Sequence, residues 1–440
     1  VVPHADGVAK TTSCFNDILR IPWTAKINRS NQIKFQTEVK MKRFSIIAVL
    51  LLMSCVALIF AQQAPLPDSP WNFMDTHRIG AYDFIKNHPT YDGRGVIVII
   101  CDSGVDMGVQ GLLTTSEGKP KVVDARDFSG QGDIKLKQAK IDSSGHKPAL
   151  KTSSVQLYDF ESLPKQPADS IYWIGSLDEK KYFQNAGPKD INNNGKNNDI
   201  FGLVTFEVDI EGKDRWVYFI DENGDGSLAG EKARFDYAIN RDTFSFIGRD
   251  VSKQKTLYTF AMTIHPDKKI ASFHACDNSH GTHCAGISAG FQLFGEETMH
   301  GIAPGAQVIS AKIGVGTLSG GATTTGSMKR AFEYGVEYAK DHDVPIVFSM
   351  SYGVDSEIEG RSDIEKFLDN IMAENEKIVI VTSNGNSGPG ISSAGNPSCA
   401  SRAMSVGALL PLGIARDSYG FANDGDRLMH FTSRGGEAGK

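Results

Sequence analysis

The sequence has few cysteines and little net charge. Its 440 residues contain six cysteines, and no two of them form a Cys-x-x-Cys pair. No group of histidines and cysteines has the spacing of zinc ligands, which excludes the common zinc modules. Lysine and arginine number 46 against 52 aspartates and glutamates, a net charge of −6. This balance argues against a nucleic-acid partner.

A phosphate-binding loop is also absent. The stretch 314–327 is rich in glycine and threonine, but it lacks the Gly-Lys-Ser/Thr ending that a nucleotide-binding loop needs. The apolar share of 40 % is typical of a globular protein with a sizeable core. We therefore expect a folded enzyme or binding protein without a nucleotide loop.

The N-terminal apolar run is short for a membrane span. Residues 46–60 are mostly apolar over fifteen positions, follow the basic Met41-Lys42-Arg43, and precede Ala61. This pattern predicts a secretory signal peptide over 41–61 and a secreted or extracytoplasmic protein, although a retained signal anchor stays open. Residues 1–40 show no periodicity, and we expect them to be upstream or non-structural sequence.

A lipid anchor is the alternative interpretation of this segment. Leu52-Met53-Ser54-Cys55 resembles a lipobox in which Cys55 would be lipidated. The apolar residues that follow Cys55 argue against it. We expect contact with a membrane only through the signal peptide or such an anchor.

Four cysteines remain beyond the signal peptide, namely Cys101, Cys276, Cys284 and Cys399. Secretion permits disulfides, but four cysteines allow three pairings, and the sequence does not choose among them. A bridge between Cys276 and Cys284 is one option. Cys101 lies in an apolar run and is expected to be a buried small residue.

Continuous apolar runs alternate with helical patterns along the chain. Such runs are typical of parallel strands that are buried on both faces. We predict strands over 96–101, 308–313, 345–349 and 377–381, and helices over 327–340 and 365–376. The alternation predicts an α/β fold with a doubly wound, mainly parallel sheet flanked by helices. Functional groups should then gather at the carboxyl ends of the strands.

The interval from Asp102 to His280 is 178 residues, too long for one connection between a strand and a helix. The region 127–269 is polar and less periodic. We therefore predict an inserted subdomain over 127–269, between the two parts of one domain at 62–126 and 270–440.

Two acidic loops in this insert place oxygen donors at alternate positions before a glycine, as the first half of a calcium loop does. Neither has a glutamate at position twelve, where Phe201 and Lys232 stand. A solvated turn stabilised by Asp and Asn side chains is the alternative. We expect no required cofactor, with Ca²⁺ as an option at the second loop. The two donor sets are Asp190, Asn192 and Asn194 in the first loop, and Asp221, Asn223 and Asp225 in the second.

Three polar motifs supply the groups that peptide hydrolysis by a hydroxyl nucleophile requires, namely an orienting acid, a base and an oxyanion donor. Asp102 ends a strand and is suited to orient an imidazole, His280 is suited to act as the base, and Asn386 is suited to donate to an oxyanion. Asn384 competes for the last role. His283 could instead form a metal site with His280 on a helix, but no third ligand is evident nearby.

These motifs resemble the subtilisin (subtilase) family, and within it the branch of tripeptidyl-peptidase II and pyrolysin. The resemblance extends from Tyr91 to the end of the sequence. It implies a subtilisin-like fold, peptide or protein substrates, Asp102 and His280 as the charge-relay pair, and Asn386 as the oxyanion donor. It also implies that Ser351-Tyr352-Gly353 binds the substrate backbone. Further motifs of that branch are Tyr91-Asp92-Gly93-Arg94-Gly95, residues 118–124 and Gly301-Ile302-Ala303-Pro304-Gly305-Ala306.

The family's nucleophilic serine has no counterpart in this sequence. Thr432-Ser433-Arg434-Gly435 resembles the stretch that precedes the nucleophile, and no Gly-Thr-Ser-Met/Ala turn is present. We therefore expect the serine to follow Lys440 and the chain 1–440 to be inactive by itself. A non-catalytic pseudoprotease that binds peptides is the alternative.

One departure from the resemblance concerns substrate choice. Tripeptidyl-peptidase II holds the free amine of its substrate with acidic residues, one of them directly after the Ser-Tyr-Gly segment. Val354 stands in that place here, with Asp355 one step further on, and 322–325 contains no carboxylate. Because an amine clamp needs negative charge, we favour a serine endopeptidase over an exopeptidase that releases tripeptides.

Overall fold

The computed structural model describes residue 76 and the ranges 78–183, 189–247, 258–316, 322–356, 358–417, 419–420 and 424–435. The predicted signal peptide, Cys55 and residues 1–40 lie outside the described residues. Within the described part, no helix has the length and apolarity that crossing a bilayer requires.

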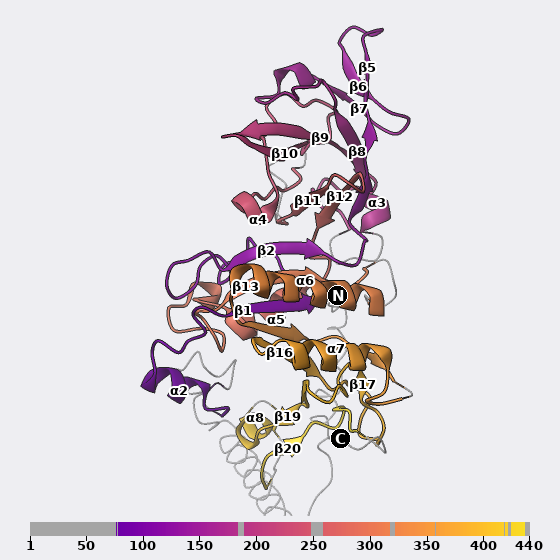
Figure 1. The fold of residues 1–440 in the computed structure, drawn as a ribbon. Coiled ribbons are helices and arrows are strands. Elements are labelled where there is room, and N and C mark those ends of the chain that lie inside the picture. Colours follow the sequence, from indigo (N-terminus) through magenta and orange to yellow (C-terminus); the bar gives the residue numbers. More distant parts are fainter. Residues whose placement is uncertain are drawn as a thin grey trace, which may run out of the picture. The chain divides into compact units, whose positions relative to one another are not determined.

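A six-stranded parallel sheet forms the centre of the fold, in the order β18-β16-β14-β1-β13-β2 (Figure 1). The strands are β1 (Ile97–Asp102), β2 (Val122–Asp127), β13 (Gln307–Lys312), β14 (Ile346–Met350), β16 (Ile378–Ser383) and β18 (Met404–Val406). Each of the four predicted strands begins within one residue of its expected start. The α/β prediction is confirmed: β1 lies inside the sheet, and all its residues are buried.

Helices cover both faces of the sheet, as a doubly wound fold requires. The helices α6 (Thr325–His342) and α7 (Asp363–Glu374) pack on β1, β14 and β16, whereas α5 (Ser279–Ala289) packs on β1 and β13. Each helix begins where a side chain caps it. Thr324 accepts from the backbone N–H of Ser327 at α6, and Ser362 forms a capping box with Glu365 at α7. These caps place both helix starts two residues before the predicted ones.

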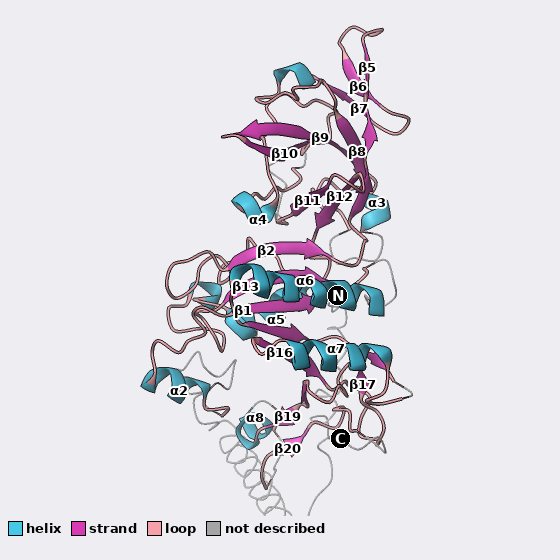
Figure 2. Cartoon of the chain, in the orientation of Figure 1, coloured by secondary structure: helices cyan, strands magenta, loops and turns pink. Residues whose placement is uncertain are grey.

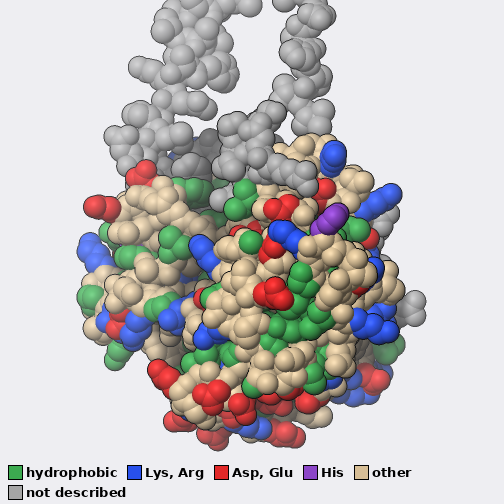
Figure 3. Space-filling model, turned by 90° about the horizontal axis from the view of Figure 1, so that it is seen from above, with side chains coloured by type: hydrophobic (Ala, Val, Ile, Leu, Met, Phe, Trp, Pro, Cys, Tyr) green, Lys and Arg blue, Asp and Glu red, His purple; other side chains and the backbone are tan. Residues whose placement is uncertain are grey.

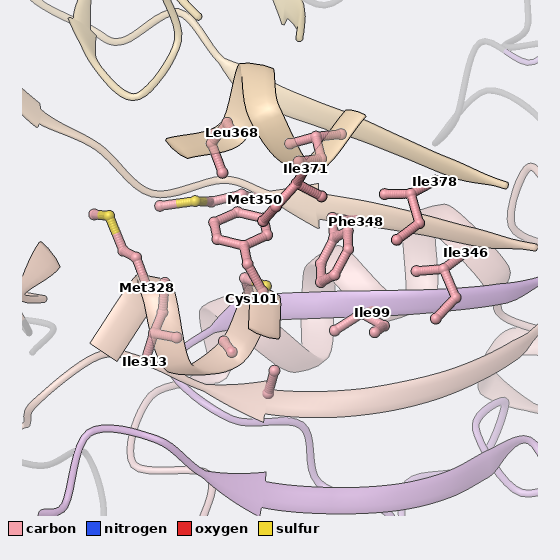
Figure 4. Close-up of a cluster of buried hydrophobic side chains, with 14 of the residues drawn as sticks. Ile99, Cys101, Ile313, Met328, Ile346, Phe348, Met350, Leu368, Ile371 and Ile378 are labelled. Atoms are coloured by element: carbon pink, nitrogen blue, oxygen red, sulfur yellow. The ribbon is translucent and has the colours of Figure 1, made fainter. Parts of the chain in front are cut away.

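Successive residues of β1 face opposite sides of the sheet. Ile99 and Cys101 join the core beneath α6 and α7, where Figure 4 shows their side chains converging with those of Phe348 and Leu368. Val98 and Ile100 join the core beside α5. The same alternation directs Asp102, the last residue of β1, toward the face that α5 covers.

The inserted region is built mostly of antiparallel strands, in contrast to the helix-flanked parallel sheet (Figure 2). Its sheets have the orders β10-β9-β8-β4, β11-β12-β3 and β5-β6-β7. Aromatic rings fill one of its cores, including Phe244, Phe246, Phe260 and Phe273. The strands are β3 (Asp133–Lys135), β4 (Lys137–Gln138), β5 (Lys140–Asp142), β6 (Ala149–Lys151), β7 (Gln156–Tyr158), β8 (Trp173–Asp178), β9 (Ile200–Ile210), β10 (Lys213–Ile220), β11 (Ala261–His265) and β12 (Ile270–His274).

The insert extends beyond its predicted end at Lys269. Strand β12 pairs with β11 and β3, so the sheet of the insert continues to His274. This strand also lies against β2 of the central sheet. The chain therefore passes directly from the insert into the segment 275–279 that leads to His280.

Short elements complete the described chain. They are α2 (Ala81–Asn87), α3 (Glu179–Tyr182), α4 (Tyr237–Asn240), α8 (Leu412–Asp417), β15 (Val354–Asp355), β17 (Gly395–Asn396), β19 (Leu409–Leu410), β20 (Arg427–Leu428) and the 3₁₀ turns Phe160–Ser162 and Leu293–Gly295. Cys101, Cys276 and Cys284 are free thiols. The structure therefore contradicts a bridge between Cys276 and Cys284.

Gly335 of α6 lies against the central sheet, so a substitution there tests how the helix packs on the sheet. A Cβ atom there would lie 2.2 Å from Cζ of Phe348 and 2.7 Å from Cδ1 of Ile99. We predict that Gly335→Ala lowers the free energy of unfolding by about 1–3 kcal/mol through overpacking, although alanine is the better helix former by about 1 kcal/mol. Urea unfolding measures the change.

Gly326→Ala in the first turn of the same helix is the matched control. The nearest atom to a Cβ there is Nη1 of Arg330, at 3.3 Å on a flexible side chain. We expect this variant to be as stable as the wild type or more stable. A gain in stability for both variants would contradict the packing described here.

Candidate active site

The structure brings Asp102 and His280 together across the 178 residues that separate them. Nδ1 of His280 lies 2.8 Å from Oδ1 and 2.9 Å from Oδ2 of Asp102. The Asp102 carboxylate is buried, whereas the His280 side chain is 48 % exposed. A carboxylate in this position fixes the imidazole and leaves Nε2 as the nitrogen that can exchange a proton.

Polar contacts fix the start of α5 beside the end of β1. The Asn278 side chain caps the helix by accepting from the backbone N–H of His280 at 2.8 Å. The Ser103 hydroxyl donates to the carbonyl of Asn278 at 3.0 Å and accepts from the N–H of Gly281 at 3.1 Å. Ser103 and Asn278 thus hold His280 in position. Neither was predicted as a site residue from the sequence.

Gly281 allows the close approach that this arrangement needs. A Cβ atom there would lie 2.3 Å from the carbonyl oxygen of Gly104 and 3.2 Å from Cβ of Asp102. No side chain larger than hydrogen fits without movement of the backbone. The glycine after His280 is therefore a requirement of the contact between α5 and β1.

A buried ion pair anchors the segment that leads into α5. Nζ of Lys312 donates to Asp277 Oδ2 at 2.7 Å, and both side chains are less than 5 % exposed. Lys312 is the register partner of Asp102 in the sheet. The pair therefore ties the residue before the helix cap to the strand beside Asp102. A lysine at the end of an apolar strand is the sequence signal for such a buried pair.

The pKa of His280 lies above the ordinary value for histidine. The main cause is the hydrogen bond to Asp102, followed by the contact with the Cys284 thiol, while partial burial opposes both. A carboxylate beside an imidazole favours the imidazolium. The site thus favours the cationic form of His280 that proton transfer would create.

The segment 351–353 follows β14, at the same sheet edge as Asp102. The Tyr352 ring lies 6.3 Å from the His280 ring, at 84° to it. Ser351 and Gly353 are exposed. The structure therefore brings Tyr352 to His280 and leaves Ser351 and Gly353 open on the surface.

Two asparagines after β16 differ in their surroundings. Nδ2 of Asn384 donates to the Ser433 carbonyl at 2.5 Å, and its Oδ1 accepts from the Thr432 hydroxyl at 3.2 Å. Asn386 is exposed. No hydrogen bond of its side chain to another described residue is seen. Asn384 is therefore engaged in the fold, and Asn386 is the amide that is open to a ligand.

The predicted calcium loop uses its oxygen atoms internally. Asp221 accepts from the backbone N–H groups of Asp225 and Gly226 at 3.0 and 2.8 Å, and Asn223 Oδ1 also accepts from Asp225 at 3.0 Å. In the first loop, Asp190 accepts in the same way from Asn194 and Gly195. Such bonds are those of Asx turns. Calcium at Asp221, Asn223 and Asp225 stays a prediction.

The side chains that could hold a metal ion with His280 do not include His283, the ligand considered from the sequence. Among the described residues, the one group of three donors that could hold an ion is Asp102, His280 and Cys284, within 4.8 Å of one another. His283 is exposed and does not belong to it. The site therefore offers no support for a metal centre shared by His280 and His283.

The Asp102–His280 contact generates a prediction on titration. Asp102→Asn removes the charge, so the pKa of His280 should fall toward the ordinary value of about 6.5, and further than in Cys284→Ala. Because the pKa of His280 is higher in the folded than in the unfolded protein, the pair contributes its full stabilisation at a pH below the ordinary histidine pKa. This stabilisation is lost as the pH rises through the raised pKa. NMR titration of the imidazole C–H signals measures the pKa of His280. An unchanged midpoint in Asp102→Asn would contradict the prediction.

The two asparagines generate a prediction on stability. Asn384→Ala leaves the buried Ser433 carbonyl without its donor, which should cost about 1–3 kcal/mol in the free energy of unfolding. Asn386→Ala is the matched variant and should stay within about 0.5 kcal/mol of the wild type. Thermal and urea unfolding measure the stability of both variants. An equal loss of stability in both would contradict the conclusion that Asn384 alone is engaged in the fold.

Comparison with known proteins places the chain in a family. A model of the Subtilase family, Peptidase S8, matches residues 93–439. Tripeptidyl-peptidase 2 of Oryza sativa subsp. japonica is 28 % identical over 79 % of this chain and 29 % of its own length. Pyrolysin of Pyrococcus furiosus is 27 % identical over 83 % of this chain and 29 % of its own length. The chain thus spans less than a third of these relatives.

A solved structure shares the fold. The crystal structure of tripeptidyl peptidase 2 (TPP II) superimposes with a TM-score of 0.60 at 22 % sequence identity, over 80 % of this chain and 30 % of that one. Together with the parallel sheet and the family match, this likeness confirms the predicted subtilisin-like fold. The chain belongs to the subtilase family of serine peptidases.

Proposed function

We propose that the whole protein is a secreted serine endopeptidase whose nucleophilic serine follows Lys440. The observation that carries the proposal is the contact between the buried Asp102 carboxylate and Nδ1 of His280. The signal-peptide pattern over 41–61 supports secretion. Chain 1–440 alone, which contains no nucleophile turn, is then inactive.

Each residue has a definite task in the proposed reaction. Nε2 of His280 takes the proton of the serine hydroxyl as the oxygen attacks the peptide carbonyl, and later gives it to the leaving amine. Asp102 stabilises the imidazolium between these transfers. The free amide of Asn386 donates to the oxygen of the tetrahedral intermediate, an interaction worth about 2.7–4 kcal/mol in subtilisin itself.

The exposed edge of the central sheet supports the idea that further protein covers it. Among the described strands, β18 pairs with β16 alone. Met404 and Val406 of β18 are 59 % and 48 % exposed. An apolar edge strand in this state is prone to pair with other chains. Residues after Lys440 that include the serine would bury it.

The surface beside Tyr352 supports an endopeptidase. Val354, directly after the Ser-Tyr-Gly segment, is 42 % exposed, and it stands where tripeptidyl-peptidase II has an acidic residue. Glu359, further along, is buried and accepts from the N–H of Ala394. Neither Val354 nor Glu359 offers a free carboxylate to a substrate amine, which supports an internal peptide segment as the substrate.

The distribution of surface charge supports a peptide or protein partner. On the face that Figure 3 shows, lysine and arginine side chains are interspersed with acidic and apolar ones. Nucleic-acid binding requires a continuous basic surface. The net charge of −6 likewise argues against a nucleic-acid partner.

Substrate end groups test the proposal. The full-length protein should cleave a fluorogenic peptide with an acetylated amine about as fast as the same peptide with a free amine. His280→Ala should lower kcat by on the order of 10⁶-fold, as loss of the proton-transferring histidine does in subtilisin. His283→Ala, three residues along α5, is the control and should keep full activity.

The alternatives predict different results. Cleavage only of the free-amine peptide, three residues from its end, would indicate a tripeptidyl exopeptidase. Peptide binding without cleavage would indicate a pseudoprotease. Loss of activity in His283→Ala together with inhibition by chelators would indicate a metal hydrolase.

A further inference from the structure

The loop that follows β13 lies beside the active-site pair. The backbone N–H groups of Ile313 and Gly314 both donate to the carbonyl of Asp102, at 2.8 and 3.2 Å. Strand β1 lies between β13 and β14, so the segments 313–316 and 351–353 leave the sheet on opposite sides of Asp102. Ligands of open α/β sheets bind at this edge, outside the carboxyl ends of the strands. The two segments therefore flank the place where a peptide that reaches the pair must lie.

A glutamine of the insert holds this loop. Gln131 lies in the turn between β2 and β3, and its Oε1 accepts from the backbone N–H of Gly316 at 2.6 Å. Its Nε2 donates to the carbonyl of Tyr182, at the end of α3, at 2.6 Å. One side-chain amide thus joins three segments, which are the first turn of the insert, α3 of the insert and the loop after β13.

Further contacts fix the insert's side of this link. Tyr182 is buried in the aromatic core of the insert, and its hydroxyl donates to the carbonyl of Asp133 at 2.9 Å. The backbone N–H of Gln131 donates to the Ser129 hydroxyl at 3.1 Å. Gln131 therefore holds the loop against an ordered part of the insert.

On its other side the loop packs against the buried ion pair of Lys312 and Asp277. A Cβ atom on Gly316 would lie 2.3 Å from Oδ2 of Asp277. Nζ of Lys312 donates to that oxygen at 2.7 Å and to the carbonyl of Gly314 at 2.5 Å. The base of the loop is thus held by Lys312, whereas Gly316 is held by Gln131.

We propose that Gln131 is a positioning residue through which the inserted subdomain sets the affinity of the site for extended peptides. A loop that is already ordered before the peptide arrives costs less entropy on binding. Because Lys312 holds the base of the loop independently, loss of Gln131 should free Gly316 without moving the Asp102–His280 pair. The role in substrate binding rests on the proposed peptidase function, whereas the link itself does not.

Hydrogen exchange of the full-length protein tests the link. The segment 313–316 should exchange about 5- to 10-fold faster in Gln131→Ala than in the wild type, as the loss of one hydrogen bond implies. Gln131→Met keeps the length of the side chain without its amide and should behave alike, which separates lost hydrogen bonds from lost packing. Unchanged exchange in both variants would overturn the link.

Gln307→Ala is the matched control for these variants. Gln307 begins β13, and its Nε2 donates to the carbonyl of Pro120 at 2.8 Å, at the opposite end of the strand from the loop. This variant should leave the exchange of 313–316 unchanged. Faster exchange of 313–316 in Gln307→Ala as well would show a general loosening of the fold and overturn the assignment to Gln131.

Peptide length tests the role in substrate binding. In the full-length protein, Gln131→Ala should raise KM for an extended peptide by about 5- to 10-fold, with a change in kcat of less than about 2-fold. A single-residue ester lies next to His280 and does not extend along the loop, so its KM should change by less than about 2-fold. A merely structural role of Gln131 would instead lower kcat for both substrates.

The possible failures are distinguishable. Equal changes for the two substrates, or no change for the extended peptide, would overturn the role of Gln131 in binding while the peptidase function stands. Cleavage of neither substrate by the wild type would contradict the proposed function and with it this role. The exchange of 313–316 would still decide whether the link exists.

Discussion

The hydrogen bond between the buried Asp102 carboxylate and Nδ1 of His280 is the interaction on which the site depends. A buried carboxylate is costly unless its oxygens have partners. Here the partners are the His280 imidazole and the backbone N–H of Ser103, the latter at 2.7 Å from Oδ1. The strand end and the helix start must therefore lie close together, and the other polar contacts nearby maintain that approach.

The two faces of the central sheet have different roles. The face beneath α6 and α7 is apolar and supplies packing. On the α5 face, polar residues follow apolar ones near the carboxyl ends of the strands. Ser310 of β13 contacts Nε2 of His274 and accepts from the N–H of Val105. Burial, together with the charge of Lys312, lowers the pKa of His274 to about 3, so this histidine stays neutral beside the Lys312–Asp277 pair.

Much of the fold and the centre of the site could be predicted from the sequence. Strands such as β1 have a continuous apolar run, which is typical of a parallel strand buried on both faces. Asp102 and His280 were identifiable because their motifs are local and occur in the right order. Successive residues of a strand face opposite sides of the sheet, so the position of Asp102 in β1 also predicts which face its side chain lies on.

Features that depend on distant partners could not be predicted. Lys312 finds Asp277 only because β13 lies beside β1, and the end of the insert at His274 depends on the pairing of β12 with β3. Asn384 and Asn386 look equivalent in a glycine-rich turn. They differ because the segment containing Thr432 and Ser433 folds back onto Asn384 alone.

Labelling of the full-length protein with a fluorophosphonate shows whether His280 activates a serine. The reagent reacts only with a serine that an adjacent base has activated. Peptide mapping by mass spectrometry should place the label on a single serine after Lys440, and His280→Ala should abolish it. An unlabelled wild-type protein, or a label that persists in His280→Ala, would contradict the account of Asp102 and His280 as a catalytic pair.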